Sequence, residues 1–173
     1  MAQFPLSRIV PTEEDMLFRN KLIHGIAHDE GVAFMRGVSG HAGLFGKAID
    51  VAKVWDMMRR GGVYGGKRYL SKQSLDTFTT CAFCHEGNRR GLGFDKPQLV
   101  FKAEESNVPE DVSLNSYGHS GFTGTLAWVD KDAELVYVFL SNRIHPTRHN
   151  TTIYDLEIRT RIHKLVYKLM PRK

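Results

Sequence analysis

The sequence is poor in the residues and segments that mark several classes of protein. It has two cysteines and six prolines among 173 residues, with no low-complexity tract and no internal repeat. These features argue against a disulfide-rich scaffold and against a fibrous or disordered chain. The longest apolar run, Leu135 to Leu140, is too short to cross a bilayer, so we expect no membrane span in this chain. The first ten residues also lack the apolar core of a signal peptide.

The charge is mildly positive and evenly spread. The net charge is +5, and lysine and arginine occur from Arg8 to Lys173 without forming a basic stripe with interleaved aromatics. We therefore expect no nucleic-acid partner. With 42% hydrophobic residues, the chain suffices for one sizeable core. We treat residues 1–173 as a single partial domain, with a loop-and-helix part over 1–90 and an antiparallel sheet plus C-terminal helix over 91–173.

The two cysteines lie close together, in the segment Cys81-Ala-Phe-Cys84-His85. This spacing matches a haem-attachment motif and could also begin a metal site. A haem needs a second axial ligand, and zinc needs two more ligands at motif spacing, which no nearby histidine supplies. We therefore expect a loop pair, either reduced or joined in a local disulfide, and no metal site.

The first 90 residues predict loops and two helices. Residues 7–45 are polar and punctuated by glycine, which favours extended and looping structure with a short helical turn near 13–17. Over 47–60 apolar residues recur every three or four positions, which predicts a helix. A second short helix is expected over 70–78, with Ser71 as its N-cap. The apolar face of the first helix consists of Ala48, Val51, Ala52, Trp55 and Met58.

The second half predicts strands near 91–95, 117–130 and 134–142. In the last of these strands the residues that point to either face of the sheet are apolar. We therefore expect it to be covered on both faces and central in its sheet. A C-terminal helix should begin at Thr152, with Asp155 in the capping-box position. Together these elements predict an α+β fold with the helix packed on an antiparallel sheet. The expected apolar stripe of that helix is Ile158, Ile162, Leu165, Val166 and Leu169.

These elements leave one sheet boundary without a partner. Three strands and one long helix cannot cover so apolar a sheet unless helices of the first half fold over its other face. A strand edge can still remain unpaired, and such an edge favours pairing between copies of a chain. A homo-oligomer through an exposed sheet edge is therefore one expected partner.

The segment from Tyr117 to Thr125 has the strongest chemical signal. Gly118-His-Ser-Gly121 is close to a nucleophile elbow, but Phe122 replaces the last glycine and a strand follows where an elbow requires a helix. A plain β-turn, in which the glycines only relieve crowding, is a second interpretation. In a third, His119-Ser-Gly121 is a strand-borne triad that lines a serine acyl-transfer pocket.

Several motifs occur in a fixed order along the chain. They are Gly-Val-Ser-Gly-His-Ala-Gly-Leu-Phe at 37–45, Arg-Gly-Leu-Gly-Phe at 90–94, Gly-His-Ser-Gly-Phe-Thr-Gly-Thr at 118–125, Trp-Val-Asp at 128–130 and Leu-Ser-Asn-Arg at 140–143. In this combination the chain resembles the C-terminal portion of the serine β-lactamase and penicillin-binding-protein-like family. The nearest branch is esterase- or peptidase-like and uses His-x-Gly where others use Lys-Thr-Gly. Similar modules occur behind glycoside hydrolases in Bacteroidetes-type proteins.

The resemblance implies a role for each residue of the third interpretation. His119 would orient the substrate or relay a proton, and Ser120 would be a pocket hydroxyl for substrate binding. Gly121 would let the substrate lie against the strand, and the backbone N–H of Phe122 would donate to an oxyanion. The loop containing His41 would flank the pocket, with that histidine more readily explained as a hydrogen-bonded structural residue than as a catalytic one. No cofactor is implied, because serine acyl transfer needs none.

The sequence also departs from the family pattern. No serine has lysine three residues later, so Ser-x-x-Lys is absent, and the Tyr-x-Asn motif is represented only by Ser113-Leu-Asn115, in the wrong place. We therefore expect a C-terminal fragment of a hydrolase of the β-lactamase, D-Ala-D-Ala carboxypeptidase or esterase kind, inactive alone. Its expected partners are the missing N-terminal half of its own domain and a small amide, ester or β-lactam-like substrate.

Two points stay open on the sequence alone. The same scaffold could serve as a non-catalytic module that binds a partner, because a fold does not fix a function. The resemblance further implies a parent protein in the periplasm or cell envelope, although this chain carries no targeting segment that we recognise.

Overall fold

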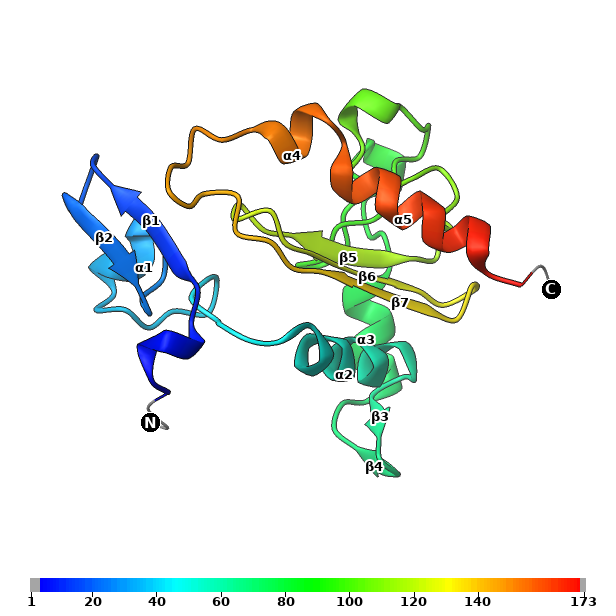
Figure 1. Cartoon of the computed structure of the whole chain (residues 1–173). Helices are drawn as coiled ribbons and strands as arrows, with labels where there is room; N and C mark the ends of the chain where they lie inside the picture. Colours follow the sequence, from blue (N-terminus) through cyan, green and yellow to red (C-terminus); the bar gives the residue numbers. More distant parts are fainter. Residues whose placement is uncertain (1–3, 172–173) are drawn as a thin grey trace.

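The computed structural model describes residues 4–171. Figure 1 shows a small N-terminal unit beside a three-stranded sheet, with helices on both faces of that sheet. The combination of helices with antiparallel strands confirms the predicted α+β class. Within residues 4–171, no helix has the length and apolarity needed to cross a membrane.

The N-terminal unit is built around a hairpin. Residues 13–17, predicted as a helical turn, instead belong to a strand and the reversal that follows it. The carboxylate of Asp15 holds this reversal, because it accepts hydrogen bonds from the amides of Leu17, Phe18 and Arg19. Burial alone would raise the pKa of Asp15, but these bonds lower it to about 2. The unit contains η1 (Leu6–Arg8), the antiparallel pair β1 (Pro11–Asp15) and β2 (Lys21–His24), and α1 (Glu30–Phe34).

The central sheet has the order β5-β6-β7, with all pairs antiparallel. Its strands are β5 (Tyr117–Ser120), β6 (Leu126–Asp130) and β7 (Leu135–Phe139). The strand predicted over 117–130 is therefore two strands, separated by a turn. The prediction that the last strand is central was wrong. β6 is central and buried along its whole length. Within residues 4–171, β7 pairs only with β6 and is half-buried, so its apolar residues are covered on both faces although the strand lies at an edge.

The strand predicted near 91–95 does not form. In this segment only Asp95 makes a β-bridge, with Gly118. Gly93 has φ +87°, a left-handed conformation that interrupts an extended chain. The amide of Leu92 donates instead to the carbonyl of Phe78, which ties the segment to the end of a helix.

Two helices of the first half cover one face of the sheet. The periodicity correctly predicts α2 (Ala48–Arg59), although Ala48 itself is exposed. Ser71 caps α3 (Lys72–Thr79) as expected, since its side chain accepts from the amide of Ser74. A small hairpin of β3 (Val63–Tyr64) and β4 (Lys67–Arg68) joins them. The core on this face comprises Met58, Leu75, Tyr117 and Val129, with Trp55, Met57, Phe94 and Val136 packed against it.

The C-terminal helix covers the other face, but not with the predicted stripe. The chain forms α4 (Thr152–Asp155) and, after Glu157 at φ 50°, α5 (Ile158–Leu169). Asp155 accepts from the Thr151 hydroxyl and does not complete a capping box. The buried residues of α5 are Arg159 and His163, whereas Ile162, Leu165 and Leu169 are exposed. The core beneath it comprises Val108, Val112, Leu126, Trp128 and Tyr137, with Phe139, Val166 and Tyr167 packed against it.

The connection between α3 and the sheet contains the two cysteines. Cys81 and Cys84 are joined in a disulfide, one of the two states expected from the sequence. Two short helical turns lie in this connection, η2 (Cys84–Glu86) and η3 (Ala103–Glu105). Within residues 4–171, no group of three or more His, Cys, Asp or Glu side chains is arranged to hold a metal ion.

Candidate active site

The predicted site residues lie where β5 ends and the chain turns back into β6. His119 and Ser120 are the last residues of β5, and Gly121 opens the turn. The amide of Gly121 donates to the carbonyl of Thr125 at 2.8 Å, and the amide of Gly124 donates to the carbonyl of Gly121 at 2.9 Å. A strand and not a helix follows this turn, as the sequence predicted, so Gly118–Gly121 does not form a nucleophile elbow.

His119 is exposed and has a defined tautomer. Its Nδ1 lies 2.8 Å from the carbonyl oxygen of Ser120, and its Nε2 lies 3.4 Å from Nη2 of Arg90. A carbonyl can only accept and a guanidinium can only donate, so Nδ1 carries the proton and Nε2 presents a lone pair. In this tautomer Nε2 is the hydrogen-bond acceptor that His119 offers at the end of β5. The hydroxyl of Ser120 has no partner among residues 4–171.

Arg90 and Asp95 complete this corner and were not among the predicted site residues. A carboxylate oxygen of Asp95 lies 2.5 Å from Nη1 of Arg90, and the backbone of Asp95 exchanges two hydrogen bonds with Gly118. The bridge to β5 thus fixes the carboxylate, and the carboxylate fixes the guanidinium beside His119. Arg90 could have been found from the sequence, because it opens the Arg-Gly-Leu-Gly-Phe motif, but no sequence signal points to Asp95.

Phe122 is held on three sides while its amide stays free. Its carbonyl accepts from Nε of Arg143 at 2.9 Å and from the hydroxyl of Tyr154 at 3.3 Å. The Arg143 guanidinium lies 4.5 Å from the centre of its ring, and the ring of His28 stacks on it at 5.2 Å. Its backbone N–H makes no hydrogen bond within residues 4–171. This N–H belongs to the peptide between Gly121 and Phe122, whose carbonyl is held by the amide of Gly124 at 2.9 Å. A held peptide with an unused N–H is the arrangement that an oxyanion donor requires.

The residue that stacks on Phe122 belongs to an ion-pair network. Nε2 of His28 lies 2.8 Å from Glu13, which also pairs with Arg148, and Arg148 reaches Glu30 at 2.9 Å. Burial alone would raise the pKa of Glu13, but hydrogen bonds from Arg148 and His28 bring it below its ordinary value. The N-terminal hairpin therefore presents a charged, hydrogen-bonded support to the turn that carries Phe122.

The segment Ser113-Leu-Asn115 has a structural role. The amide and hydroxyl of Ser113 both donate to Asp130 at 2.8 Å, and the side-chain amide of Asn115 donates to Asp132. These contacts attach the segment to the turn between β6 and β7. The segment thus holds the β6–β7 turn and lies apart from the end of β5, where a catalytic motif would be needed.

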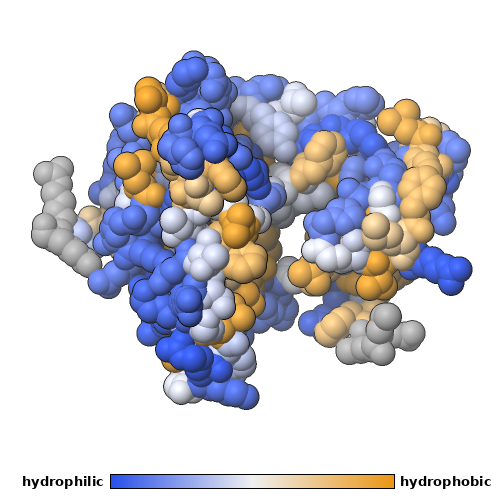
Figure 2. Space-filling view, turned by 180° about the vertical axis from the view of Figure 1, so that it is seen from behind, coloured by the Kyte–Doolittle hydropathy of each residue, from blue (hydrophilic) through white to orange (hydrophobic). Residues whose placement is uncertain are grey.

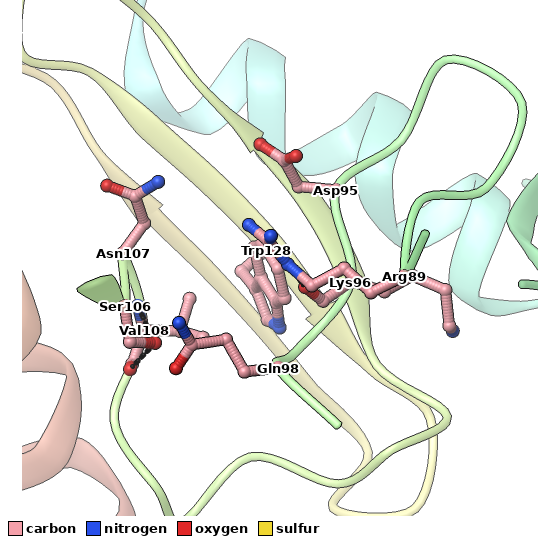
Figure 3. Close-up of a pocket in the computed structure, with 8 residues that line it drawn as sticks. All are labelled: Arg89, Asp95, Lys96, Gln98, Ser106, Asn107, Val108 and Trp128. Atoms are coloured by element: carbon pink, nitrogen blue, oxygen red, sulfur yellow. Dashed lines mark hydrogen bonds between the residues drawn. The ribbon is translucent and has the colours of Figure 1, made fainter. Parts of the chain in front are cut away.

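A small pocket lies near this site, but none of the predicted residues lines it. In Figure 3, Trp128 rises from β6 between Lys96 and the segment of Ser106 and Val108. Burial lowers the pKa of Lys96, whose ammonium donates to the carbonyl of Ser116 at 3.1 Å. The pocket touches the corner described above only through Asp95.

Comparisons with known proteins point to one family. The model of the family described as "Beta-lactamase" matches residues 8–160. A protein named "Putative D-alanyl-D-alanine carboxypeptidase" from Escherichia coli O157:H7 is 33% identical over an alignment of 156 residues, and the match covers 82% of this chain and 34% of the relative. Proteins of the same name from E. coli K12 and Salmonella agona are each 34% identical, over 73% of this chain and 29% of their own length. The chain thus spans about a third of the length of these curated relatives.

Proposed function

The chain belongs to the beta-lactamase family, and we propose that it supplies one wall of a serine acyl-transfer site that acts on a small amide or ester. In this proposal the end of β5 and the turn after it face the acyl group. His119 orients the substrate or relays a proton, Ser120 offers a hydroxyl, and Gly121 lets the substrate approach the strand. The names of the relatives favour a peptide amide as the substrate class.

The unused amide of Phe122 is the observation that carries this proposal. Acyl transfer passes through a tetrahedral intermediate whose oxyanion needs fixed donors. The amide has no partner among residues 4–171, while Arg143 and Tyr154 hold the carbonyl of the same residue. The N–H itself belongs to the peptide between Gly121 and Phe122, whose carbonyl accepts from the amide of Gly124 at 2.9 Å, so turning the N–H away would break that hydrogen bond. This rigidity supports an oxyanion role and argues against the plain-turn interpretation.

The nucleophile is proposed to come from outside the printed sequence. No serine here has lysine three residues later, and a donor and an orienting histidine lower no barrier without an attacking group. We therefore propose that the site at the end of β5 is inactive in acyl transfer when this chain is alone. The missing Ser-x-x-Lys and Tyr-x-Asn motifs would belong to an N-terminal half of the same domain.

Exposed apolar side chains support such a partner. Figure 2 shows apolar side chains gathered on the surface of the N-terminal unit, where Met16, Leu17 and Phe34 are each more than two thirds exposed. On α5, Leu165 and Leu169 are 54% and 84% exposed, on the stripe that the sequence predicted to be buried. Exposed apolar patches of this kind often mark surfaces that another protein or another part of the domain covers. The unpaired edge of β7 offers pairing between two copies of the chain as another way to cover apolar surface.

Labelling with a reporter penicillin tests the proposal. The purified chain should give no covalent adduct in intact-mass spectrometry, whereas a longer product that includes Ser-x-x-Lys should give one adduct per chain, mapped to that serine. An adduct on the short chain would contradict the proposed source of the nucleophile. No adduct on a folded longer product would instead favour a non-catalytic, partner-binding module.

A further inference from the structure

The loop before α2 contains a second group of nucleophile, base and acid, separate from the end of β5. The hydroxyl of Ser39 lies 2.6 Å from Nδ1 of His41, and Nε2 of the same imidazole lies 3.0 Å from a carboxylate oxygen of Asp29. None of the three residues hydrogen-bonds with residues 119–122. The family resemblance assigned this loop only a flanking role.

The hydrogen bonds of this group match one tautomer of His41 that suits nucleophilic catalysis. A carboxylate can only accept, so Nε2 of His41 must carry the proton that bridges to Asp29. In the neutral form of this tautomer, Nδ1 carries no proton and accepts the hydrogen bond from the Ser39 hydroxyl. Either imidazole nitrogen can act as a base when the other one is held in this way. The hydrogen bond from His41 also lowers the pKa of Asp29, which keeps the carboxylate ionised.

The position of Asp29 is fixed independently of the histidine. Asp29 is the N-cap of α1, and the same carboxylate oxygen accepts from the amide of Val32 at 2.9 Å. Gly31 lies close by, since a Cβ there would meet that oxygen at 3.0 Å and the His41 ring at 3.7 Å. The acid is thus anchored to a helix end, and the imidazole has room beside it because residue 31 is glycine.

The loop also provides unused donors and open access. No backbone amide from Val38 to Gly46 donates a hydrogen bond to the described part of the chain, so the amides next to Ser39 remain available to an oxyanion. A Cβ at Gly40 or Gly46 would meet nothing within 4 Å. The side chains of His41 and Asp29 are 52% and 42% exposed. The base and the acid of this group are therefore open to solvent, and Ser39 is partly exposed beside them.

We infer that Ser39, His41 and Asp29 form a second acyl-transfer centre, which attacks small activated carboxylic esters. Oγ of Ser39 forms a bond with the acyl carbon and passes its proton to Nδ1 of His41. The C–O bond to the leaving alkoxide breaks, and the alkoxide takes that proton. Water then attacks the acyl-serine with the same imidazole as base, which releases the acid. Asp29 acts as a positioning residue, since it holds the tautomer and touches no reacting atom.

Active-site labelling of the intact chain tests this centre. The purified protein is treated with an alkyl fluorophosphonate, and the adduct is followed by intact-mass spectrometry and mapped to a peptide. One adduct at Ser39 is expected, abolished in Ser39→Ala. The matched control is Ser74→Ala, which removes an exposed serine whose hydroxyl is hydrogen-bonded to Ser71 and to no histidine.

The base and the acid are tested by the labelling rate. His41→Ala should lower the rate about 100-fold, and added imidazole should restore part of it, whereas His149→Ala, at an exposed histidine, should have no effect. Asp29→Asn keeps an oxygen that can cap α1, so a roughly tenfold loss would report on the tautomer. Asp29→Glu should recover part of that loss.

Three outcomes would overturn the inference. They are no adduct, an adduct on another serine, or labelling of Ser39 at an unchanged rate in His41→Ala, which would mean only that the serine is accessible. Because the reporter penicillin tests a different nucleophile, failure of this centre leaves the proposed role of β5 untouched.

Discussion

Arg148 donates to both carboxylate oxygens of Glu13, with Nε 2.8 Å from Oε1 and Nη2 2.7 Å from Oε2. The two residues are 135 positions apart, and Glu13 is almost fully buried. A two-pronged pair of this kind is strong because both bonds are charge-assisted and share one geometry. It joins the N-terminal hairpin to the loop after β7, next to the ring of Phe122.

Loss of this pair should release the hairpin. We expect Arg148→Ala to lower the free energy of opening of β1 and β2 by about 3 kcal/mol, because Glu13 would be left buried without its cation. Hydrogen exchange of the hairpin amides measures this opening. The control is Lys53→Ala, which breaks an exposed pair with Asp50 and should cost less than about 1 kcal/mol. Equal protection in both variants would contradict the assigned role of the pair.

His163 should make the protein sensitive to mild acid. It is fully buried between the rings of Tyr137 and Tyr167, and burial lowers its pKa from 6.5 to about 4. The unfolded chain binds a proton near pH 6.5 and the folded chain only near pH 4. Stability is therefore complete above pH 6.5 and falls by about 3 kcal/mol as the pH drops to 4.

Replacement of His163 isolates this contribution. Denaturant unfolding from pH 7 to 4 should show a smaller loss of stability in His163→Phe than in the parent chain, since phenylalanine binds no proton. His149→Ala, at an exposed histidine, should keep the parental slope. Parallel slopes in all three proteins would show that another group dominates the acid response.

The oxyanion role of Phe122 depends on its backbone and not on its ring. Phe122→Pro removes the N–H, whereas Phe122→Ala keeps it. In a longer product with the serine-lysine motif, the proline variant should acylate with a reporter penicillin about 100-fold more slowly, and the alanine variant much less so. Unfolding midpoints of both variants show whether the turn survives. Similar rates in the two folded variants would remove the amide from the mechanism.

Gly118 is required by the close packing of β5 on β6. A Cβ there would lie 2.2 Å from Cε3 of Trp128 and 2.3 Å from the carbonyl oxygen of Ala127. Because both belong to the rigid centre of the sheet, Gly118→Ala should destabilise the fold by about 3 kcal/mol. Gly46→Ala is the control, since a Cβ there meets nothing within 4 Å. Thermal unfolding of the two variants makes the comparison, and equal midpoints would contradict it.

Local patterns in the sequence predicted some elements well. The period of apolar residues gave α2, and the serine before a short helix gave the cap of α3. The turn at 130–133 and the two strands around it also follow from local residue types. These features depend on neighbours within a few positions, which is the range that such patterns describe.

Other features depend on contacts that no local pattern contains. The buried face of α5 carries Arg159 and His163, because Arg159 donates to Thr125 and His163 stacks on Tyr137. The periodicity of apolar residues therefore predicted the wrong buried face of α5. The centre of the sheet was misassigned for a similar reason, since an apolar strand can be covered on both faces and still lie at an edge.

The residues of the candidate site likewise divide into those that the local sequence predicted and those that it did not. The motif around His119 was found from its sequence, and its residues remain together at the end of β5. The residues that hold the site in place could not be predicted from the sequence. Asp95 contacts Arg90 because its backbone bridges to Gly118, and Glu13 contacts His28 because the hairpin folds back. The relation among Ser39, His41 and Asp29 likewise spans a helix start and a loop.

The disulfide between Cys81 and Cys84 closes a ring of only a few residues. A cross-link stabilises mainly by reducing the entropy of the unfolded chain, and the reduction grows with the length of the closed loop. Because the sequence has no other cysteine, no disulfide cross-links the N-terminal hairpin, the sheet and α5 to one another. The tertiary structure should therefore form and dissolve without thiol chemistry, and refolding in a reducing buffer should recover everything except the local loop.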